Sequence, residues 1–141
     1  MDMKHRELVL TSYEALSADL EVLVTRFYNN LFKVAPAARD LFPGDPKRQH
    51  QHFAAAIAML ARNVMDIEAM DEPLRDLGRR HLEYRVLPEH YELARKMLVE
   101  TLAECAGDRW TPEHTKAWEA LIARTSQLML HGTLIEARQQ Q

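Results

Sequence analysis

Seven histidines occur in the chain, and one of them, His81, has a pattern of neighbours that could support chemistry. With residues placed about 100° apart around a helix, His81 shares a side with Leu74, Leu77 and Tyr84, while charged residues take the opposite side. Gly78 lies at the edge of this apolar side, where we expect its missing side chain to permit the close approach of something flat or bulky. An imidazole buried without a partner costs about 1–3 kcal/mol. Two interpretations of His81 therefore stay open: a hydrogen bond to a backbone carbonyl, or a bond to a metal or cofactor.

The other candidate ligands limit what kind of metal site is conceivable. No H-E-x-x-H motif is present, and the single Cys105 excludes an internal disulfide and a multi-cysteine zinc site. His50 and His52 point about 200° apart on a helix, and both diverge from its apolar stripe by roughly 60°, so we expect neither to serve as a ligand. One axial imidazole instead suits a cofactor that brings its own remaining ligands, as haem does. We expect the six other histidines to be solvated: His5, His50, His52, His90, His114 and His131.

The composition is that of one water-soluble domain covering residues 1–141. Hydrophobic residues make up 47% and charged residues 28%, and only 4 Gly and 6 Pro occur, which favours an all-α fold. A net charge of −3 gives no electrostatic footprint for nucleic acid or for an anionic membrane. The first seven residues are too polar for a secretory signal, and the longest charge-free apolar run, residues 53–61, is far below the roughly 20 residues that span a bilayer. The lone cysteine fits a reducing compartment, so we expect a cytoplasmic protein.

Proline, glycine and capping residues divide the chain into segments of helical length. Apolar periodicity predicts helices over about 4–17 and 19–34, followed by a short turn from Pro36 that ends at Leu41-Phe42. Asp45-Pro46 is typical of a helix start, and the helix that follows carries Gln49, Phe53 and Ile57 on one stripe.

Three further helices are predicted in the second half. Their expected starts are Pro73, Pro88 and Thr111-Pro112, and Gly107 closes the second of them. The total is six main helices plus a short turn helix, with a polar tail at residues 138–141.

Several short motifs, in this order and spacing, resemble one family. They are Phe27-Tyr28-x-x-Leu31-Phe32, Pro36, Leu41-Phe42, Leu77-Gly78-Arg79-Arg80-His81 and His90-Tyr91. The chain is similar over about residues 6–135 to bacterial single-domain globins, relatives of the haem domain of flavohaemoglobins. The resemblance implies a globin fold, a haem b cofactor, and His81 as the proximal ligand to iron.

The resemblance also implies roles for residues on the gas-binding, distal side of the haem. Phe42 matches the aromatic that packs on the porphyrin, and Tyr28 matches the tyrosine that donates its hydroxyl to dioxygen. Gln49 matches the polar position of the distal helix, and Phe53 stands where the family usually has leucine, which places a larger group above the iron. The alternatives are an ordinary core Phe and Tyr and an exposed Gln in a first helical turn.

On the proximal side, Tyr91 matches a tyrosine that joins a carboxylate of the last helix in a network to the proximal imidazole. Thr133 occupies the carboxylate position here, with Glu136 three residues further on. Threonine cannot make the imidazole a stronger electron donor to iron, as a carboxylate would. The substitution therefore favours reversible gas binding over catalytic turnover.

The expected function is a haem globin that binds dioxygen, and also NO or CO, reversibly at the open sixth position of the iron, as in oxygen transport. The alternative is a nitric oxide dioxygenase that depends on an external reductase, because the chain has no phosphate-binding glycine loop of its own. A haem-free helical regulator is a third hypothesis. No catalytic residue is assigned; the expected partners are diatomic gases and a reductase, and the expected state is a monomer or weak homodimer.

Overall fold

The computed structural model describes residues 1–42, 44–82 and 88–139, and among these it contains helices and no strands. The side chains of residues 81, 82 and 132–139 lie outside this description. The six α-helices are α1 (Met3–Leu16), α2 (Leu20–Val34), α3 (Pro46–Arg62), α4 (Asp71–Leu82), α5 (Pro88–Ala106) and α6 (Pro112–Gln139). Four 3₁₀ helices join them: η1 (Ser17–Asp19), η2 (Pro36–Leu41), η3 (Val64–Met70) and η4 (Gly107–Arg109).

Side-chain caps fix where several helices begin. The Asp45 carboxylate accepts a hydrogen bond from the Lys47 amide at 3.1 Å, which confirms the predicted start of α3. The Thr111 hydroxyl accepts one from the His114 amide at 3.4 Å and confirms the predicted start of α6. At the other end of α5, Gly107 adopts a φ of 61°, a conformation that glycine reaches without a steric penalty.

Three predicted boundaries differ from the structure. Helix α4 begins at Asp71, two residues before the expected Pro73, because a proline in the first turn needs no amide hydrogen. The preceding η3 was not predicted, and Asp66 kinks it with φ −125° and ψ 52°. Helix α6 continues to Gln139, so it includes the first two residues of the predicted polar tail.

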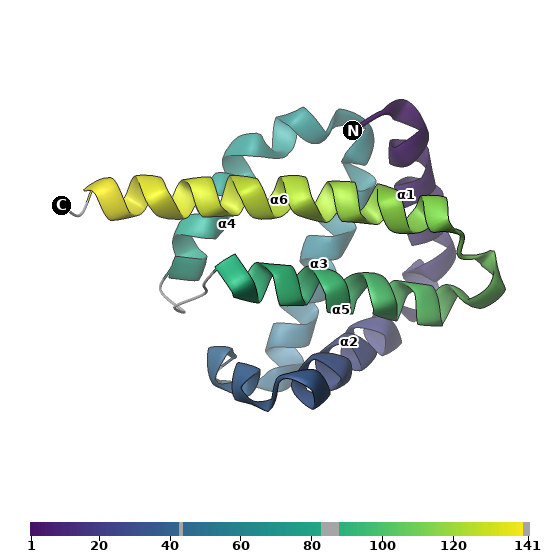
Figure 1. Cartoon of the computed structure of the whole chain (residues 1–141), viewed down its shortest axis with the longest axis horizontal. Helices are drawn as coiled ribbons and strands as arrows, with labels where there is room; N and C mark the ends of the chain where they lie inside the picture. Colours follow the sequence, from purple (N-terminus) through teal and green to yellow (C-terminus); the bar gives the residue numbers. More distant parts are fainter. Residues whose placement is uncertain (43, 83–87, 140–141) are drawn as a thin grey trace.

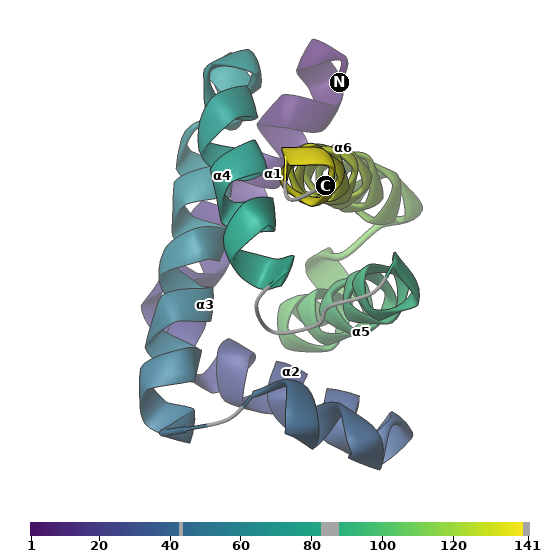
Figure 2. The same ribbon diagram turned by 90° about the vertical axis from the view of Figure 1, so that its left-hand side faces the viewer.

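The first and last helices pack against each other, and α5 runs side by side with α6 (Figures 1 and 2). The buried Trp118 of α6 donates its indole N–H to the Ser12 hydroxyl of α1 at 2.9 Å. Helix α2 packs against α5, where the Asn30 amide donates to the Thr101 hydroxyl at 3.1 Å. In both of these helix pairs a polar side chain inside the contact has a hydrogen-bond partner.

At Gly78, helix α4 lies closer to α6 than any side chain at that position would allow. A Cβ added to Gly78 would lie 1.9 Å from the backbone oxygen of Met129, so only glycine fits there. Two side-chain hydrogen bonds also join α4 to α6: Asp71 accepts one from Arg124 at 2.5 Å, and Arg75 donates one to His131 Nδ1 at 3.0 Å. These three contacts fix the position of α4, the helix that contains His81.

In the part of the chain that the structure describes, no helix combines the length and apolar character needed to cross a membrane.

Candidate functional site

Six ring side chains form one group centred on Tyr28; they come from α2, from α3 and from the residue directly after η2. We call this group the Tyr28 cluster; its members are Phe27, Tyr28, Phe32, Phe42, His50 and Phe53. Tyr28 itself is 4% exposed, although it carries a polar hydroxyl. It is buried because residue 28 lies on the inward face of α2, next to Val24 and Leu31 in the apolar stripe.

Phenylalanines surround the edges of the Tyr28 ring. Phe42, directly after η2, meets it edge-on, with centroids 5.2 Å apart and planes at 89°. Phe53 of α3 meets it at 5.7 Å and 66°, and Phe53 is itself held by a parallel stack on Phe27 at 4.6 Å. The structure thus brings together three of the predicted site residues, Tyr28, Phe42 and Phe53, from distant parts of the sequence.

His50 also belongs to the cluster, which the sequence analysis did not predict. Its imidazole stacks on the face of Tyr28, with centroids 4.5 Å apart and planes at 8°. The expectation that His50 is solvated and diverges from the site is wrong. His52 and His131 are exposed as expected, whereas His5, His90 and His114 are half-buried.

Gln49 precedes His50 in the first turn of α3, and its side chain is half-buried. It is therefore neither the exposed residue of the alternative interpretation nor a fully enclosed one.

Burial makes the Tyr28 phenol harder to ionise. Loss of hydration raises the pKa of the phenol to about 12, because the ionised form is disfavoured away from water. A phenol is protonated at neutral pH even without this shift, so the hydroxyl can donate a hydrogen bond.

His81 lies in the last turn of α4, and its side chain is outside the described residues. The predicted helical context of His81 is confirmed, as is the burial of Leu74. Leu77 is half-buried, and Tyr84 lies outside the described residues.

Gly78 plays a different part from the one expected. The sequence suggested that its missing side chain makes room for something flat or bulky, whereas the structure places the backbone of Met129 there. The glycine serves the contact of α4 with α6.

Tyr91, the predicted proximal-side tyrosine, lies in the first turn of α5. It is half-buried, its hydroxyl oxygen is enclosed, and burial raises the pKa of the phenol to about 12. Thr133 and Glu136, its predicted neighbours, are in α6, but their side chains lie outside the described residues.

The Tyr28 cluster fits a flat, apolar cofactor. Its members Phe42 and Phe53 pack on the core yet stay half-buried, as do Leu60 of α3 and Leu77 of α4. A planar apolar group would cover such side chains. A haem brings its other ligands and needs one axial histidine from the chain, and α4 contains a histidine in its last turn.

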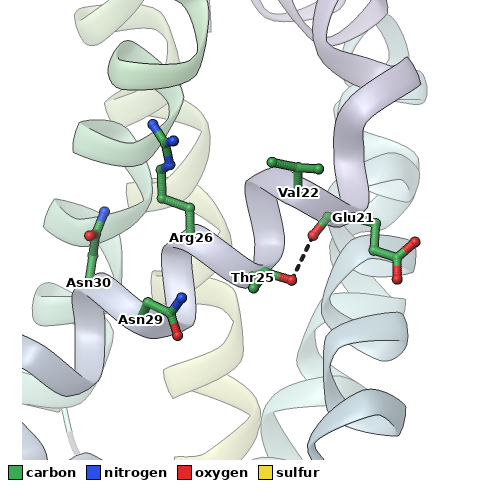
Figure 3. A pocket seen from close by; sticks show the side chains of 6 residues that line it. All are labelled: Glu21, Val22, Thr25, Arg26, Asn29 and Asn30. Carbon is green, nitrogen blue, oxygen red and sulfur yellow. Dashed lines mark hydrogen bonds between the residues drawn. The ribbon is translucent and has the colours of Figure 1, made fainter.

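A surface depression of about 530 Å³ lies elsewhere, along α2, and two of its lining residues, Arg26 and Asn30, reach toward α5 (Figure 3). Its lining comes from α2 alone, with Glu21, Val22, Thr25, Arg26, Asn29 and Asn30. Thr25 donates its hydroxyl to the Glu21 carbonyl at 2.9 Å, which is an ordinary internal helix contact. Among the described residues no group of three or more His, Cys, Asp or Glu could hold a metal ion, in this depression or elsewhere.

Comparison with known proteins defines the class of this protein. The globin family model matches residues 25–129, so the chain belongs to the globin family. An engineered carbene transferase, RmaNOD from Rhodothermus marinus, has the same fold, with a TM-score of 0.84, 25% identity and coverage of 98% of this chain and 94% of that one. The predicted all-α globin fold is thereby confirmed.

Two curated relatives indicate which members of the globin family this chain is similar to. Anaerobic nitrite reductase NSHB5 of Oryza sativa subsp. indica is 31% identical over 120 residues, which cover 80% of this chain and 82% of the relative. The flavohemoprotein of Deinococcus radiodurans is 27% identical over 130 residues, which cover 90% of this chain and 32% of the relative. The protein is related to bacterial globins and to the haem part of flavohaemoglobins, and its cofactor is a haem.

Proposed function

We propose that this globin binds dioxygen reversibly at its haem, with His81 as the axial ligand and Tyr28 as the hydrogen-bond donor to the gas. When bound, the haem supplies an iron with an open coordination position for a diatomic molecule. The observation that carries the proposal is the placement of Tyr28: a protonated phenol, 4% exposed, inside a cluster of aromatic rings.

The chain's own residues account for a high affinity. The phenol hydroxyl donates to the polarised gas, and the surrounding rings exclude competing water, which strengthens the hydrogen bond in the low-dielectric pocket. Gln49 offers a second donor from α3, and Phe42 and Phe53 provide the apolar walls. Each donor slows the dissociation of the gas by the net worth of one hydrogen bond, about 1–1.5 kcal/mol or roughly tenfold.

The test replaces Tyr28 with Phe, which removes the hydroxyl and keeps the ring. Stopped-flow measurement should show the dioxygen dissociation rate rising by about tenfold. Tyr13→Phe is the matched control, since Tyr13 is also 4% exposed but lies in α1, outside the Tyr28 cluster. An unchanged rate in Tyr28→Phe would refute the donor role.

A second experiment tests the axial ligand. His81→Gly should lose the optical spectrum of histidine-ligated haem, and added imidazole should restore it by filling the vacated position. A spectrum that is unaltered by the substitution rules out His81 as the ligand.

The second candidate function is nitric oxide dioxygenation with an external reductase, and the flavohemoprotein relative supports it. This chain aligns with 32% of that relative, so any reducing partner would be a separate protein or domain. The two functions separate in one assay: NO is added to the oxygenated protein with and without a flavin reductase. A storage or transport protein yields about one nitrate per haem in both cases, and an enzyme yields many when the reductase is present.

A further inference from the structure

We propose that His50 is a positioning residue for Tyr28, holding the phenol ring at the angle from which its hydroxyl meets the gas. This inference rests on the proposed function and deepens it. The family resemblance assigned no role to position 50, and helical periodicity directed it away from the site.

The stack between His50 and Tyr28 restrains the tilt of the phenol ring. The two rings are within 8° of parallel, with centroids 4.5 Å apart, so the imidazole covers one face of the phenol. Phe42 and Phe53 meet the same phenol at 89° and 66°. Phe27 and Phe32 also contact the phenol, at 70° and 37°. A ring in contact with one parallel neighbour and four inclined ones has little freedom to tilt.

Loss of the imidazole would leave one face of the Tyr28 ring uncovered. Tyr28 is fixed to α2, whereas His50 is on α3, so the stack also ties the two helices that form this side of the site. Phe53 is held by Phe27 and cannot move over to replace the lost ring, because that pair is itself stacked at 4.6 Å. Removing His50 therefore leaves a gap against one face of Tyr28, and the phenol can adopt more than one orientation.

Substitution at position 50 can separate an effect of ring stacking from an effect of hydrogen bonding. A phenylalanine at position 50 preserves a flat ring of similar size but removes both nitrogen atoms. If His50 acts by covering the Tyr28 face, His50→Phe retains its effect and His50→Ala does not.

The experiment compares four variants of the haem-loaded protein: His50→Ala, His50→Phe, Tyr28→Phe and, as a matched control, His52→Ala, which changes an exposed histidine on the same helix. The first readout is the infrared C–O stretching band of the carbon monoxide complex, which senses the position of the phenol hydroxyl. We expect one band in the wild type, in His52→Ala and in His50→Phe, and a split or broadened band in His50→Ala. Dioxygen dissociation should accelerate by about 3- to 10-fold in His50→Ala alone among the histidine variants, as expected for the loss of one aromatic contact.

A second readout tests the stack independently of gas binding. In proton NMR of the carbon monoxide form, the ring protons of His50 should be shifted upfield by the Tyr28 ring current, and Tyr28→Leu should abolish that shift. A His50 spectrum that is indifferent to Tyr28→Leu overturns the inference.

The outcomes distinguish this inference from the function on which it rests. If Tyr28→Phe alters the band and the rate while His50→Ala matches His52→Ala, the positioning role is refuted and the donor role stands. If His50→Phe behaves like His50→Ala, the imidazole acts through its nitrogen atoms, and positioning by stacking is refuted. If Tyr28→Phe changes neither readout, the donor role and the positioning role both fail.

Discussion

Tyr28 shows how a polar group can be buried for a purpose at the scale of one residue. Its ring satisfies the packing of α2 against α3, and its hydroxyl remains the polar group that the surrounding rings enclose. The sequence motif predicted a role for this residue from its resemblance to a family, and the structure adds that the residue is buried, which raises the pKa of its phenol to about 12.

The raised pKa of Tyr28 makes stability depend on alkaline pH. The phenol ionises near pH 10 in an unfolded chain and at about 12 in the folded protein. Its stabilising contribution is complete below pH 10 and is lost as pH rises from 10 to about 12, because only the unfolded chain releases the proton there. Urea unfolding followed by circular dichroism should show the free energy of unfolding falling over this window. The fall should be shallower in Tyr28→Phe and also in Tyr91→Phe, because burial likewise raises the pKa of the Tyr91 phenol. A Tyr28→Phe profile that runs parallel to the wild-type profile contradicts the assignment.

His50 shows why part of the site could not be predicted from sequence. A helical wheel gives the direction of a side chain within its own helix, and the apolar stripe of α3 correctly included Phe53. It does not say which neighbouring helix crosses at that height. Because α2 brings Tyr28 to the N-terminal turns of α3, a residue off the stripe reaches the cluster.

At the scale of the elements, caps and prolines predicted most helix starts well. Asp45 and Thr111 carry the cap hydrogen bonds that the sequence indicated, and Gly107 ends α5 with a positive φ. The exception is η3, where no glycine or proline interrupts residues 64–70. Its bend at Asp66 lies in a segment that contacts α1, α3 and α4, and such contacts between distant parts of the chain cannot be read from local sequence.

The contact of Gly78 with Met129 yields a prediction about α4. Gly78→Ala would place a methyl group 1.9 Å from a backbone oxygen, so α4 must move away from α6. The expected cost is about 1–3 kcal/mol of unfolding free energy, with weaker haem retention because His81 is three residues further along the same helix. Thermal unfolding and haem transfer to apomyoglobin measure the two effects.

Gly107→Ala is the comparison for this experiment, since a Cβ there meets open space and only the φ of 61° opposes it, at about 1 kcal/mol. A Gly78→Ala protein that is as stable as Gly107→Ala, with unchanged haem retention, would show that the close approach is unimportant.

At the scale of the whole molecule, the haem completes the core. Phe42, Phe53, Leu60 and Leu77 pack on buried neighbours yet remain half-buried, so the polypeptide alone leaves apolar surface uncovered. Cofactor binding should therefore be a large part of the stability of the folded state.

Thermal unfolding with and without haem tests this view. Because haem binds the folded chain in preference to the unfolded one, free haem at 1,000 times its dissociation constant should add about 4 kcal/mol and raise the Tm accordingly. His81→Ala should show a smaller rise. Equal Tm values for the two forms of the wild type would mean that the half-buried side chains are not the cofactor's walls.

The bond between Ser12 and Trp118 joins residues 106 positions apart. During synthesis, α1 leaves the ribosome long before α6 exists, so the contacts between these two helices cannot form until nearly the whole chain has been translated. Other elements that α1 contacts, such as α3 and η3, emerge earlier. The nascent protein must therefore wait in an incomplete state, a period in which chaperones would bind it and in which premature truncation would leave a product prone to aggregate.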